Sequence, residues 1–386
     1  MNDDNAFLLE SFREILAVLV RFESVSRVST GGILDWIRSY LEKRGIPSES
    51  FPVGYDSSLH NLYARIGENP EGGICFSGHL DVVAARLEGW SSPPFELNER
   101  SGRLYGRGTA DMKGFLALIL ALLPFWKERG VKIPIHLCIT CDEEIGCKGV
   151  PWLTRELQSR GIRPDAVILG EPTGCIPVHG HKGGAQCTTT VTGIAGHGSN
   201  PDLGVNALYH ALDSIQILRE RQEAIKRESR REGGFIPPWT TVSVGKMEGG
   251  TSRNTIPDLC RFLWEVRVLP EEEPEALVRE LDGRMQSLLP RGTISPGLET
   301  VIESSYPGLI PREDSAALEW VRLADCMDPP RVVSFGTEAG HYSRWGIPAV
   351  VWGPGFIEQA HQTDEYLEWE QAVTYLGYLR NLETVF

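Results

Sequence analysis

The sequence lacks the features that mark several large classes of protein. It has no excess of basic residues, because its 386 residues include 38 Lys and Arg against 52 Asp and Glu, a formal charge of −14. Nucleic acid or an anionic membrane would repel such a chain overall. The first residues, MNDDNAF, carry two aspartates where a secretory signal needs basic residues, and the longest apolar run, 115–126, is too short to span a bilayer. We therefore expect a soluble, cytoplasmic protein that binds neither nucleic acid nor membrane.

A disulfide framework is not expected either. The eight cysteines fall at irregular spacings in a long chain without an export signal, which favours free thiols. Cys138 and Cys141 form one C-x-x-C, but they lie in an apolar run typical of a buried strand, and no second pair stands at zinc-ribbon spacing. The sequence favours ordinary packing for both, with a structural or redox role as the alternative.

The order of the apolar segments predicts an open α/β sheet. Helical periodicity covers 5–22 and 32–44, and four short, nearly continuous apolar runs are typical of strands buried on both faces. Further helical stretches lie between these runs, an order that implies mostly parallel strands with crossover connections. The expected strands are 74–77, 135–140, 166–169 and 349–352, and the intervening helices are 113–127 and 151–160.

The pattern changes after about residue 183. An alternating strand, a long helix, two half-exposed strands and a second helix follow in that order, which is typical of a small α+β sandwich. The buried α/β pattern returns only after about residue 293. We therefore expect a first domain of residues 1–182 and 293–386, interrupted by an inserted domain of residues 183–292. The elements expected in the insertion are strands 187–192, 239–244 and 260–268 and helices 204–229 and 272–288.

Side chains that bind metals follow the buried strands of the first domain. In open α/β sheets a ligand binds outside the carboxyl ends of the strands, so these groups should converge despite their separation in sequence. A loop that opens the apolar helix adds an aspartate, and a segment near the end of the sequence adds a histidine. The candidate ligands are His79, Asp111, Glu144, Glu171 and His361.

Two imidazoles and three carboxylates, without a thiolate, suit two zinc ions, with cobalt or manganese as substitutes and one carboxylate bridging the metals. Without cations, the converging carboxylates would repel one another strongly. Glu143, beside Glu144, can face the reacting water as general base, and Asp81 can accept the second ring N–H of His79 and fix its tautomer. Taken singly, such residues are more often helix caps or solvated groups.

Five strings resemble the motifs of a known family: SGHLDVV (77–83), GRGTADMKG (106–114), DEE (142–144), GEPT (170–173) and AHQTDEYL (360–367). They are similar to those of the dinuclear zinc amidohydrolases and exopeptidases, and the likeness spans nearly the whole chain. It implies a zinc-exopeptidase-like catalytic domain with an inserted lid and dimerisation domain, and hence a homodimer. It also implies that Asp111 bridges two zinc ions, that His79 and Glu171 hold one and Glu144 and His361 the other, that Glu143 is the base, and that Asp81 orients His79.

Other strings are similar to the branch of this family that deacetylates acetylornithine: HKGG (181–184), GHGSNPDLGVNA (196–207), GGTSRNTIPD (249–258), EVRVLP (265–270) and GTEAGHYSRWGIP (336–348). The resemblance implies hydrolysis of an N-acyl amino acid, N-acetyl-L-ornithine first. Desuccinylation of succinyl-diaminopimelate and a broader aminoacylase or dipeptidase activity are the alternatives, and a metal-binding scaffold without catalysis is the alternative from another class. Gly198, where serine is common, and His341 depart from the family pattern.

The same resemblance points to substrate-binding residues outside the metal cluster. His197 matches a lid histidine that stabilises the oxyanion and, in relatives, reaches the site of the partner subunit; taken singly, it would more often be a surface residue. Asn254 and Arg267 match positions that bind the polar end of the substrate, although Arg267 can equally be a salt-bridging strand residue. Thr337 and Glu338 precede the last buried strand, and we expect Glu338 to bind a cationic side chain, with a helix cap as the alternative.

Overall fold

The computed structural model describes residues 3–28, 30–229, 233–289 and 296–386. The chain divides into two compact units. Unit 1 comprises residues 1–180, 309–331 and 337–386, and unit 2 comprises residues 181–308 and 332–336. Unit 2 therefore interrupts unit 1, and it begins two residues from the position expected from the sequence.

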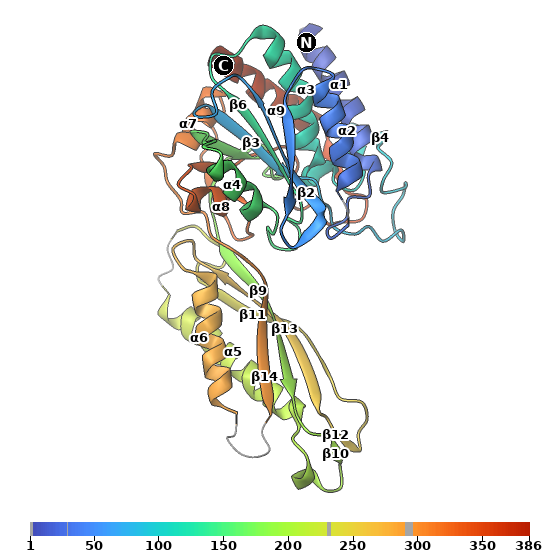
Figure 1. Ribbon diagram of the computed structural model, residues 1–386, viewed down its shortest axis with the longest axis vertical. Coiled ribbons are helices and arrows are strands. Elements are labelled where there is room, and N and C mark those ends of the chain that lie inside the picture. Colours follow the sequence, from blue (N-terminus) through green and yellow to red (C-terminus); the bar gives the residue numbers. More distant parts are fainter. Residues whose placement is uncertain (1–2, 29, 230–232, 290–295) are drawn as a thin grey trace. The chain divides into compact units, whose positions relative to one another are not determined.

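Unit 1 is built on an eight-stranded sheet with the order β1-β2-β6-β3-β7-β16-β8-β15 (Figure 1). The four central strands, β6, β3, β7 and β16, run parallel, and antiparallel strands flank them. This arrangement confirms the predicted α/β sheet. The strands are β1 (Ser48–Val53), β2 (Asp56–Ile66), β3 (Ile74–His79), β6 (Ile135–Thr140), β7 (Ala166–Leu169), β8 (Val178–His181), β15 (Arg331–Val333) and β16 (Ala349–Val351).

Helices cover both faces of this sheet. One face, which includes Phe76, shares an apolar core with α1 (Asp3–Arg21), α2 (Gly31–Glu42), α3 (Gly114–Arg129), α7 (Ala316–Leu323) and α9 (Trp369–Asn381). Successive side chains of a strand point to opposite faces, and Ser77 hydrogen-bonds Tyr342 of α8 (Ala339–Arg344) at 2.9 Å. The other face therefore packs on α8, which contacts α4 (Val150–Ser159).

The helix at the centre of this core is strongly apolar. With the preceding turn it spans Thr109–Arg129, 21 residues that are long and apolar enough to cross a membrane by length and composition. However, 89% of its apolar window is buried inside the protein. A helix that is apolar on all sides is expected in the core of a layered α/β unit, and the buried residues of α3 run without a break from Gly114 to Leu123. The helix expected at 113–127 is therefore present, with its end two residues later, at Arg129.

Unit 2 has a four-stranded antiparallel sheet with the order β11-β13-β9-β14, and α5 and α6 share its apolar core (Figure 1). In β13, buried residues such as Phe262 and Trp264 alternate with more exposed ones, because one face packs on the helices. The elements are β9 (Gly183–Thr192), α5 (Ala207–Glu228), β11 (Thr241–Gly249), β13 (Leu259–Val268), α6 (Pro274–Ser287) and β14 (Gly297–Tyr306), with a short ribbon of β10 (Gly196–His197) and β12 (Thr255–Ile256).

The end of unit 2 differs from the expected boundary. The position predicted from the sequence, 292/293, lies within residues 290–295, outside the described residues. The next strand, β14, pairs with β9 along its whole length, so unit 2 continues to Gly308. β14 is an edge strand whose buried side chains are Ser304 and Tyr306 alone, so its sequence lacks the apolar alternation that would assign it to this sheet.

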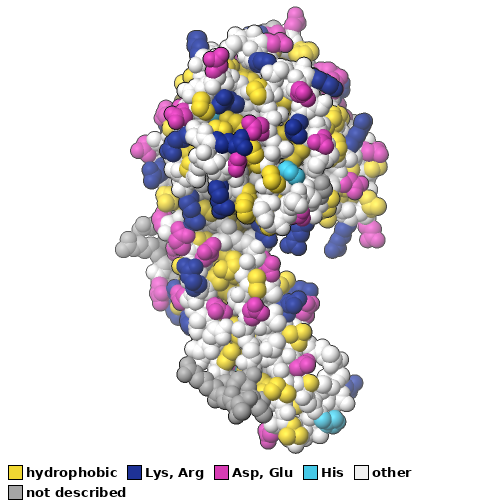
Figure 2. Space-filling model, in the orientation of Figure 1, with side chains coloured by type: hydrophobic (Ala, Val, Ile, Leu, Met, Phe, Trp, Pro, Cys, Tyr) yellow, Lys and Arg dark blue, Asp and Glu magenta, His cyan; other side chains and the backbone are white. Residues whose placement is uncertain are grey.

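All eight cysteines are free and buried, as the sequence predicts. Cys138 lies inside β6 and Cys141 just after it, and both are fully buried. On the face of the molecule drawn in Figure 2, acidic and basic side chains are interspersed rather than gathered into one patch.

Candidate metal centre

The carboxyl ends of the central parallel strands bring the expected metal-binding residues together in unit 1. His79 is the last residue of β3 and stands beside Thr140, the last residue of β6. Glu143 and Glu144 follow β6, and Glu171 follows β7. Since parallel strands end at the same edge of a sheet, residues from distant parts of the sequence meet here.

Asp111 lies between the two histidines. His79 Nε2 is 3.0 Å from Asp111 Oδ1, and His361 Nε2 is 3.4 Å from Asp111 Oδ2. Each histidine has a second carboxylate nearby: Glu171 Oε1 is 3.8 Å from His79 Nε2, and Glu144 Oε2 is 2.9 Å from His361 Nε2. Asp111 thus presents one oxygen to each of two histidine–carboxylate pairs, which is the arrangement that a bridging ligand requires.

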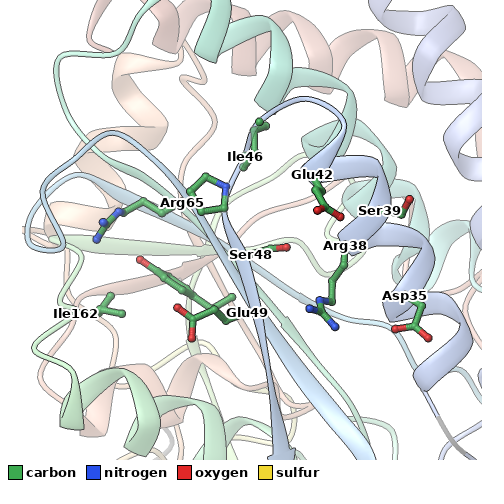
Figure 3. A pocket seen from close by; sticks show the side chains of 12 residues that line it. Asp35, Arg38, Ser39, Glu42, Ile46, Ser48, Glu49, Arg65 and Ile162 are labelled. Atoms are coloured by element: carbon green, nitrogen blue, oxygen red, sulfur yellow. The ribbon is translucent and has the colours of Figure 1, made fainter.

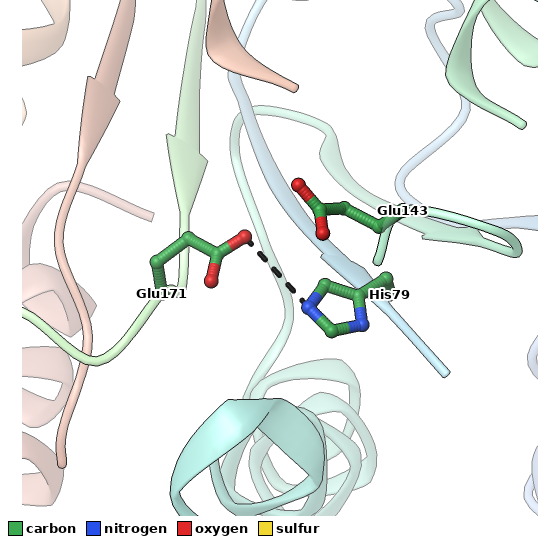
Figure 4. Close-up of side chains that lie close together, drawn as sticks. All are labelled: His79, Glu143 and Glu171. Atoms are coloured by element: carbon green, nitrogen blue, oxygen red, sulfur yellow. Dashed lines mark ion pairs between the residues drawn. The ribbon is translucent and has the colours of Figure 1, made fainter. Parts of the chain in front are cut away.

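Glu143 shares the space beside one of these pairs. Figure 4 shows the side chains of His79, Glu143 and Glu171 pointing toward one another, and one ligand atom from each lies within 4.8 Å of the others. By distance alone, Glu143 can therefore either bind a metal or face a reacting water.

The cluster carries more negative charge than a buried site tolerates without cations. Desolvation, together with the charge of Asp111, raises the pKa of Glu143 to about 7 and that of Glu144 to about 8. Hydrogen bonds to Asp111 and Glu144 raise the pKa of His361 to about 10. Protons would therefore collect at these groups, and divalent cations would displace them.

A buried carboxylate oxygen without a hydrogen-bond partner also indicates a cation site. Glu171 Oε1 has no hydrogen-bond partner among the described residues, although it is buried. Such an atom is costly unless a donor or a cation satisfies it. Imidazole nitrogens and carboxylate oxygens without thiolate are ligands that zinc, cobalt and manganese accept. The residues present therefore fit a centre for two divalent metals.

Asp81 accepts the second ring N–H of His79, as expected, and does so through its backbone oxygen. His79 Nδ1 donates to the backbone carbonyl oxygen of Asp81 at 2.9 Å, whereas the Asp81 carboxylate is 3.7 Å away. The backbone carbonyl can only accept, so it still fixes the tautomer and leaves Nε2 free to bind a metal. The Asp81 carboxylate is engaged by the loop after β6 instead. It accepts from the N–H groups of Glu143 at 3.0 Å and Glu144 at 3.2 Å.

Further residues that the sequence analysis missed hold the same loop. Asp142 accepts hydrogen bonds from the Arg27 N–H at 2.7 Å and from the Tyr55 hydroxyl at 3.0 Å. The Cys147 thiol lies 3.2 Å from Glu143 Oε1. The sequence shows that Cys147 lies close to the DEE string. Its contact with Glu143, however, depends on the conformation of the turn that joins the two residues.

Glu365 was also missed, although it lies in the string that contains His361. Its Oε1 accepts from the N–H groups of Ala110 and Asp111 at 3.0 and 3.1 Å, and its Oε2 lies 2.6 Å from Arg107 Nη1. All these partners are buried. Glu365 therefore ties the loop of Asp111 to the segment that carries His361. That segment leads into β17 (Tyr366–Glu368), which forms a small sheet with β4 (Asn98–Arg100) and β5 (Arg103–Tyr105).

Thr337 and Glu338 have different surroundings. Thr337 Oγ1 accepts from the Ala339 N–H at 3.1 Å at the start of α8, as in the helix-cap alternative. Glu338 is fully buried, and its Oε2 accepts from Thr140 Oγ1 at 2.9 Å while its Oε1 has no partner among the described residues. Desolvation and the charge of Glu143 raise the pKa of Glu338 to about 8, which places this carboxyl group near the metal cluster. His341 is half-buried on α8.

His197 and Asn254 lie together in the β10–β12 ribbon of unit 2. The Gly198 N–H donates to the Asn254 carbonyl oxygen at 2.8 Å, and a Cβ at Gly198 would approach the Asn254 backbone to 3.1 Å, which is a tight fit. The Ser199 N–H donates to His197 Nδ1 at 3.2 Å. That nitrogen is therefore an acceptor, and the exposed ring carries its proton on Nε2.

Arg267 is engaged within its own strand. Its Nε and Nη2 each lie 3.1 Å from an oxygen of Glu265, two residues earlier on the same face of β13. The salt-bridging alternative for Arg267 is thus present in the structure.

A surface hollow of about 730 Å³ lies elsewhere in unit 1 (Figure 3). Its lining includes Ile46, Ser48 and Arg65. Arg65 stands opposite His136, near the start of β6, whereas the metal cluster lies beyond the end of β6. The hollow is therefore at the opposite edge of the sheet from the candidate metal centre.

Comparisons with known proteins agree with this geometry. The model of peptidase family M20/M25/M40 matches residues 75–382. The acetylornithine deacetylase of Myxococcus xanthus is 34% identical over 372 residues, which cover 95% of this chain and 94% of that protein.

Solved structures of M20 proteins share the fold. A metallo-carboxypeptidase of the M20 family from Sulfolobus solfataricus aligns with a TM-score of 0.77 at 18% identity, covering 100% of both chains. The YXEP protein of Bacillus subtilis, described as a dinuclear metal binding peptidase of the M20 family, aligns with a TM-score of 0.64 at 16% identity, covering 98% of both chains.

Proposed function

This chain belongs to peptidase family M20/M25/M40, and we propose that it hydrolyses the amide bond of N-acetyl-L-ornithine, releasing L-ornithine and acetate. It is a metal-dependent amidohydrolase. The reaction class rests above all on Asp111, whose two oxygens face two histidine–carboxylate pairs. The choice of substrate rests on the likeness to acetylornithine deacetylases over nearly the whole chain.

Two zinc ions, with cobalt or manganese as substitutes, fit the donor set. His79 and Glu171 would hold one ion, Glu144 and His361 the other, and Asp111 both. When bound, such ions polarise the scissile carbonyl and lower the pKa of the attacking water.

The side chains supply proton transfer and orientation. Glu143 accepts a proton from the attacking water and then delivers it to the leaving amine, which is the role of a general base and acid. The Nε2–H of His197 donates to the oxyanion that develops on the carbonyl oxygen. Asn254 and Arg267 bind the polar end of the substrate, and for Arg267 this binding competes with the ion pair to Glu265.

We assign unit 2 the roles of lid and dimerisation domain. Its sheet has an open edge strand, β11, and α5 contacts this strand. Tyr209 and Leu212 on α5 are 67% and 54% exposed, and Met247 on β11 is 37% exposed. Exposed apolar side chains beside an unpaired strand edge suit a two-fold contact with a second copy of the chain. A cytoplasmic location, with no nucleic-acid or membrane partner, is part of the same proposal and is supported by the free cysteines and the negative net charge.

A panel of acylated amino acids tests the substrate. After removal of metals by a chelator the protein should be inactive, and after reconstitution with Zn²⁺ or Co²⁺ it should hydrolyse N-acetyl-L-ornithine with a kcat/KM about tenfold or more above that for N-acetyl-L-methionine. Faster turnover of N-succinyl-diaminopimelate or of dipeptides would reassign the substrate. An inactive protein with both metals bound would favour the non-catalytic scaffold.

Glu338 is our candidate for the group that binds the ammonium of the ornithine side chain. Its buried, unpartnered Oε1 lacks a donor among the described residues, and a cation would supply one. Glu338→Gln should raise KM for N-acetyl-L-ornithine about tenfold while leaving N-acetyl-L-methionine unaffected, because the charged substrate alone loses an ion pair. Steady-state kinetics on both substrates measures this difference.

Thr337→Val is the matched control, because it removes a hydrogen bond from the same helix start without changing charge. It should affect the two substrates equally. Equal losses for Glu338→Gln would show that Glu338 holds the loop rather than the substrate.

A further inference from the structure

Cys147 contacts the base of the proposed reaction directly. Its Sγ lies 3.2 Å from Glu143 Oε1, within reach of a hydrogen bond from a thiol, and its side chain is 3% exposed. The N–H groups of Gly146 and Cys147 both donate to the carbonyl oxygen of Glu143 at 2.8 Å. Cys147 therefore contacts Glu143 twice, through its backbone N–H at the carbonyl oxygen and through its thiol at the carboxylate.

The backbone of Cys147 is in a conformation that glycine adopts more readily. Its φ is 54°, in the left-handed region where a Cβ is disfavoured. Glycine at this position would relieve the strain. Backbone strain of this kind is frequent at functional sites, and here the strained residue touches Glu143.

The thiol at this position is a donor rather than a reactive group. Burial, and after it the charge of Glu143, raises the pKa of the Cys147 thiol well above its usual range. The group is therefore S–H, which donates a hydrogen bond, and not thiolate, which binds metals and reacts with oxidants.

We propose that Cys147 is a positioning residue whose S–H group holds one oxygen of the Glu143 carboxylate and so fixes the orientation in which Glu143 accepts a proton from water. This inference rests on the proposed function, which makes Glu143 the base. In the conformer that contacts the thiol, Glu143 has an oxygen within 4.8 Å of ligand atoms of His79 and Glu171, so its carboxylate lies beside the space that a metal and its water would occupy. The thiol contact opposes rotation of the carboxylate away from this orientation.

Three substitutions at Cys147 test the proposal in the metal-loaded enzyme. Cys147→Ala removes the donor and should lower kcat about tenfold, with KM and the content of two metals per chain unchanged. Cys147→Ser restores a donor of similar size and should recover most of the lost kcat. Cys147→Gly relieves the backbone strain and should raise the melting temperature relative to Cys147→Ala, yet it should remain as slow, because it has no donor.

Cys175 provides a matched control. It is also buried in unit 1, at 6% exposure, and also has a left-handed backbone, with φ 61°, but its Sγ lies near the carbonyl oxygen of Gln371 rather than near a carboxylate. Cys175→Ala should keep the wild-type kcat. If it slows the enzyme as much as Cys147→Ala does, loss of any buried thiol explains the effect and the proposal fails.

Other outcomes also overturn the proposal. Wild-type kcat in Cys147→Ala, no recovery in Cys147→Ser, or loss of a metal from Cys147→Ala would each show that the thiol does not orient the base. Failure of the proposed function is a separate result, because it appears in the wild-type protein as no hydrolysis of any acylated amino acid with both metals bound.

Discussion

Replacing Glu143 with alanine should lower kcat by about three to four orders of magnitude while both metals stay bound. A general base and acid contributes up to about four orders of magnitude, and Glu143 would act in both steps of the reaction. Its neighbours would remain in place, because the Asp81 carboxylate is bonded to backbone N–H groups of the loop rather than to the Glu143 side chain. Single-turnover kinetics and elemental analysis of the same sample measure the two quantities.

The metal content decides between the two roles that the geometry leaves open for Glu143. If Glu143 is a ligand, Glu143→Ala should bind less metal than the wild type. Glu144→Ala is the matched control: it removes the adjacent carboxylate, whose Oε2 lies 2.9 Å from His361 Nε2, and it should lose one metal. If Glu143→Ala retains a tenth of the wild-type activity with both metals bound, Glu143 is not the base.

A mixture of two inactive variants, His197→Ala and Glu143→Ala, should recover activity if His197 acts on the site of the partner subunit. Loss of one oxyanion donor costs about two to three orders of magnitude, so each variant alone is nearly inactive. In a mixed dimer, one site combines an intact Glu143 with an intact His197 from the other chain. Random pairing at equal amounts then gives about a quarter of the wild-type activity.

The control for this experiment pairs two defects in the same unit. Glu143→Ala mixed with His361→Ala should stay inactive, because both residues belong to unit 1 and each chain then has a defective catalytic site of its own: one lacks the base and the other a metal ligand. Subunit exchange has to be verified with differently tagged chains. If exchange occurs and the His197→Ala mixture stays inactive, His197 acts within its own chain or outside catalysis.

The convergence of the candidate ligands could be predicted because most of it depends on a rule about strand ends. His79, Glu144 and Glu171 follow buried strands whose direction and order can be inferred from the sequence, and parallel strands place their ends at one edge. Asp111 and His361 do not directly follow buried strands, so this rule does not place them, and the likeness to known motifs supplied their expected roles.

The contacts that orient these ligands could not be predicted in the same way. Asp81, Cys147 and Glu365 act through backbone N–H groups or through turns, and the partners of such groups depend on φ and ψ angles that the sequence does not specify. A carboxylate close to a histidine in sequence suggests a carboxylate–imidazole pair. In the structure, however, the Asp81 carboxylate accepts hydrogen bonds from two N–H groups of the loop after β6. Hydrogen bonds from two neighbouring donors to one buried carboxylate are stronger together than a single contact to a neutral ring.

The position of β16 in the sheet affects the order in which the two units can fold during translation. This strand, Ala349–Val351, follows unit 2 in the sequence, yet it pairs with β7 on one side and β8 on the other. During translation, β7 therefore keeps one apolar edge unpaired while all of unit 2 is synthesised, and unit 2, whose core is its own, can fold first. His361 follows β16, so the newly made chain acquires its second candidate histidine ligand only after all of unit 2 has been synthesised.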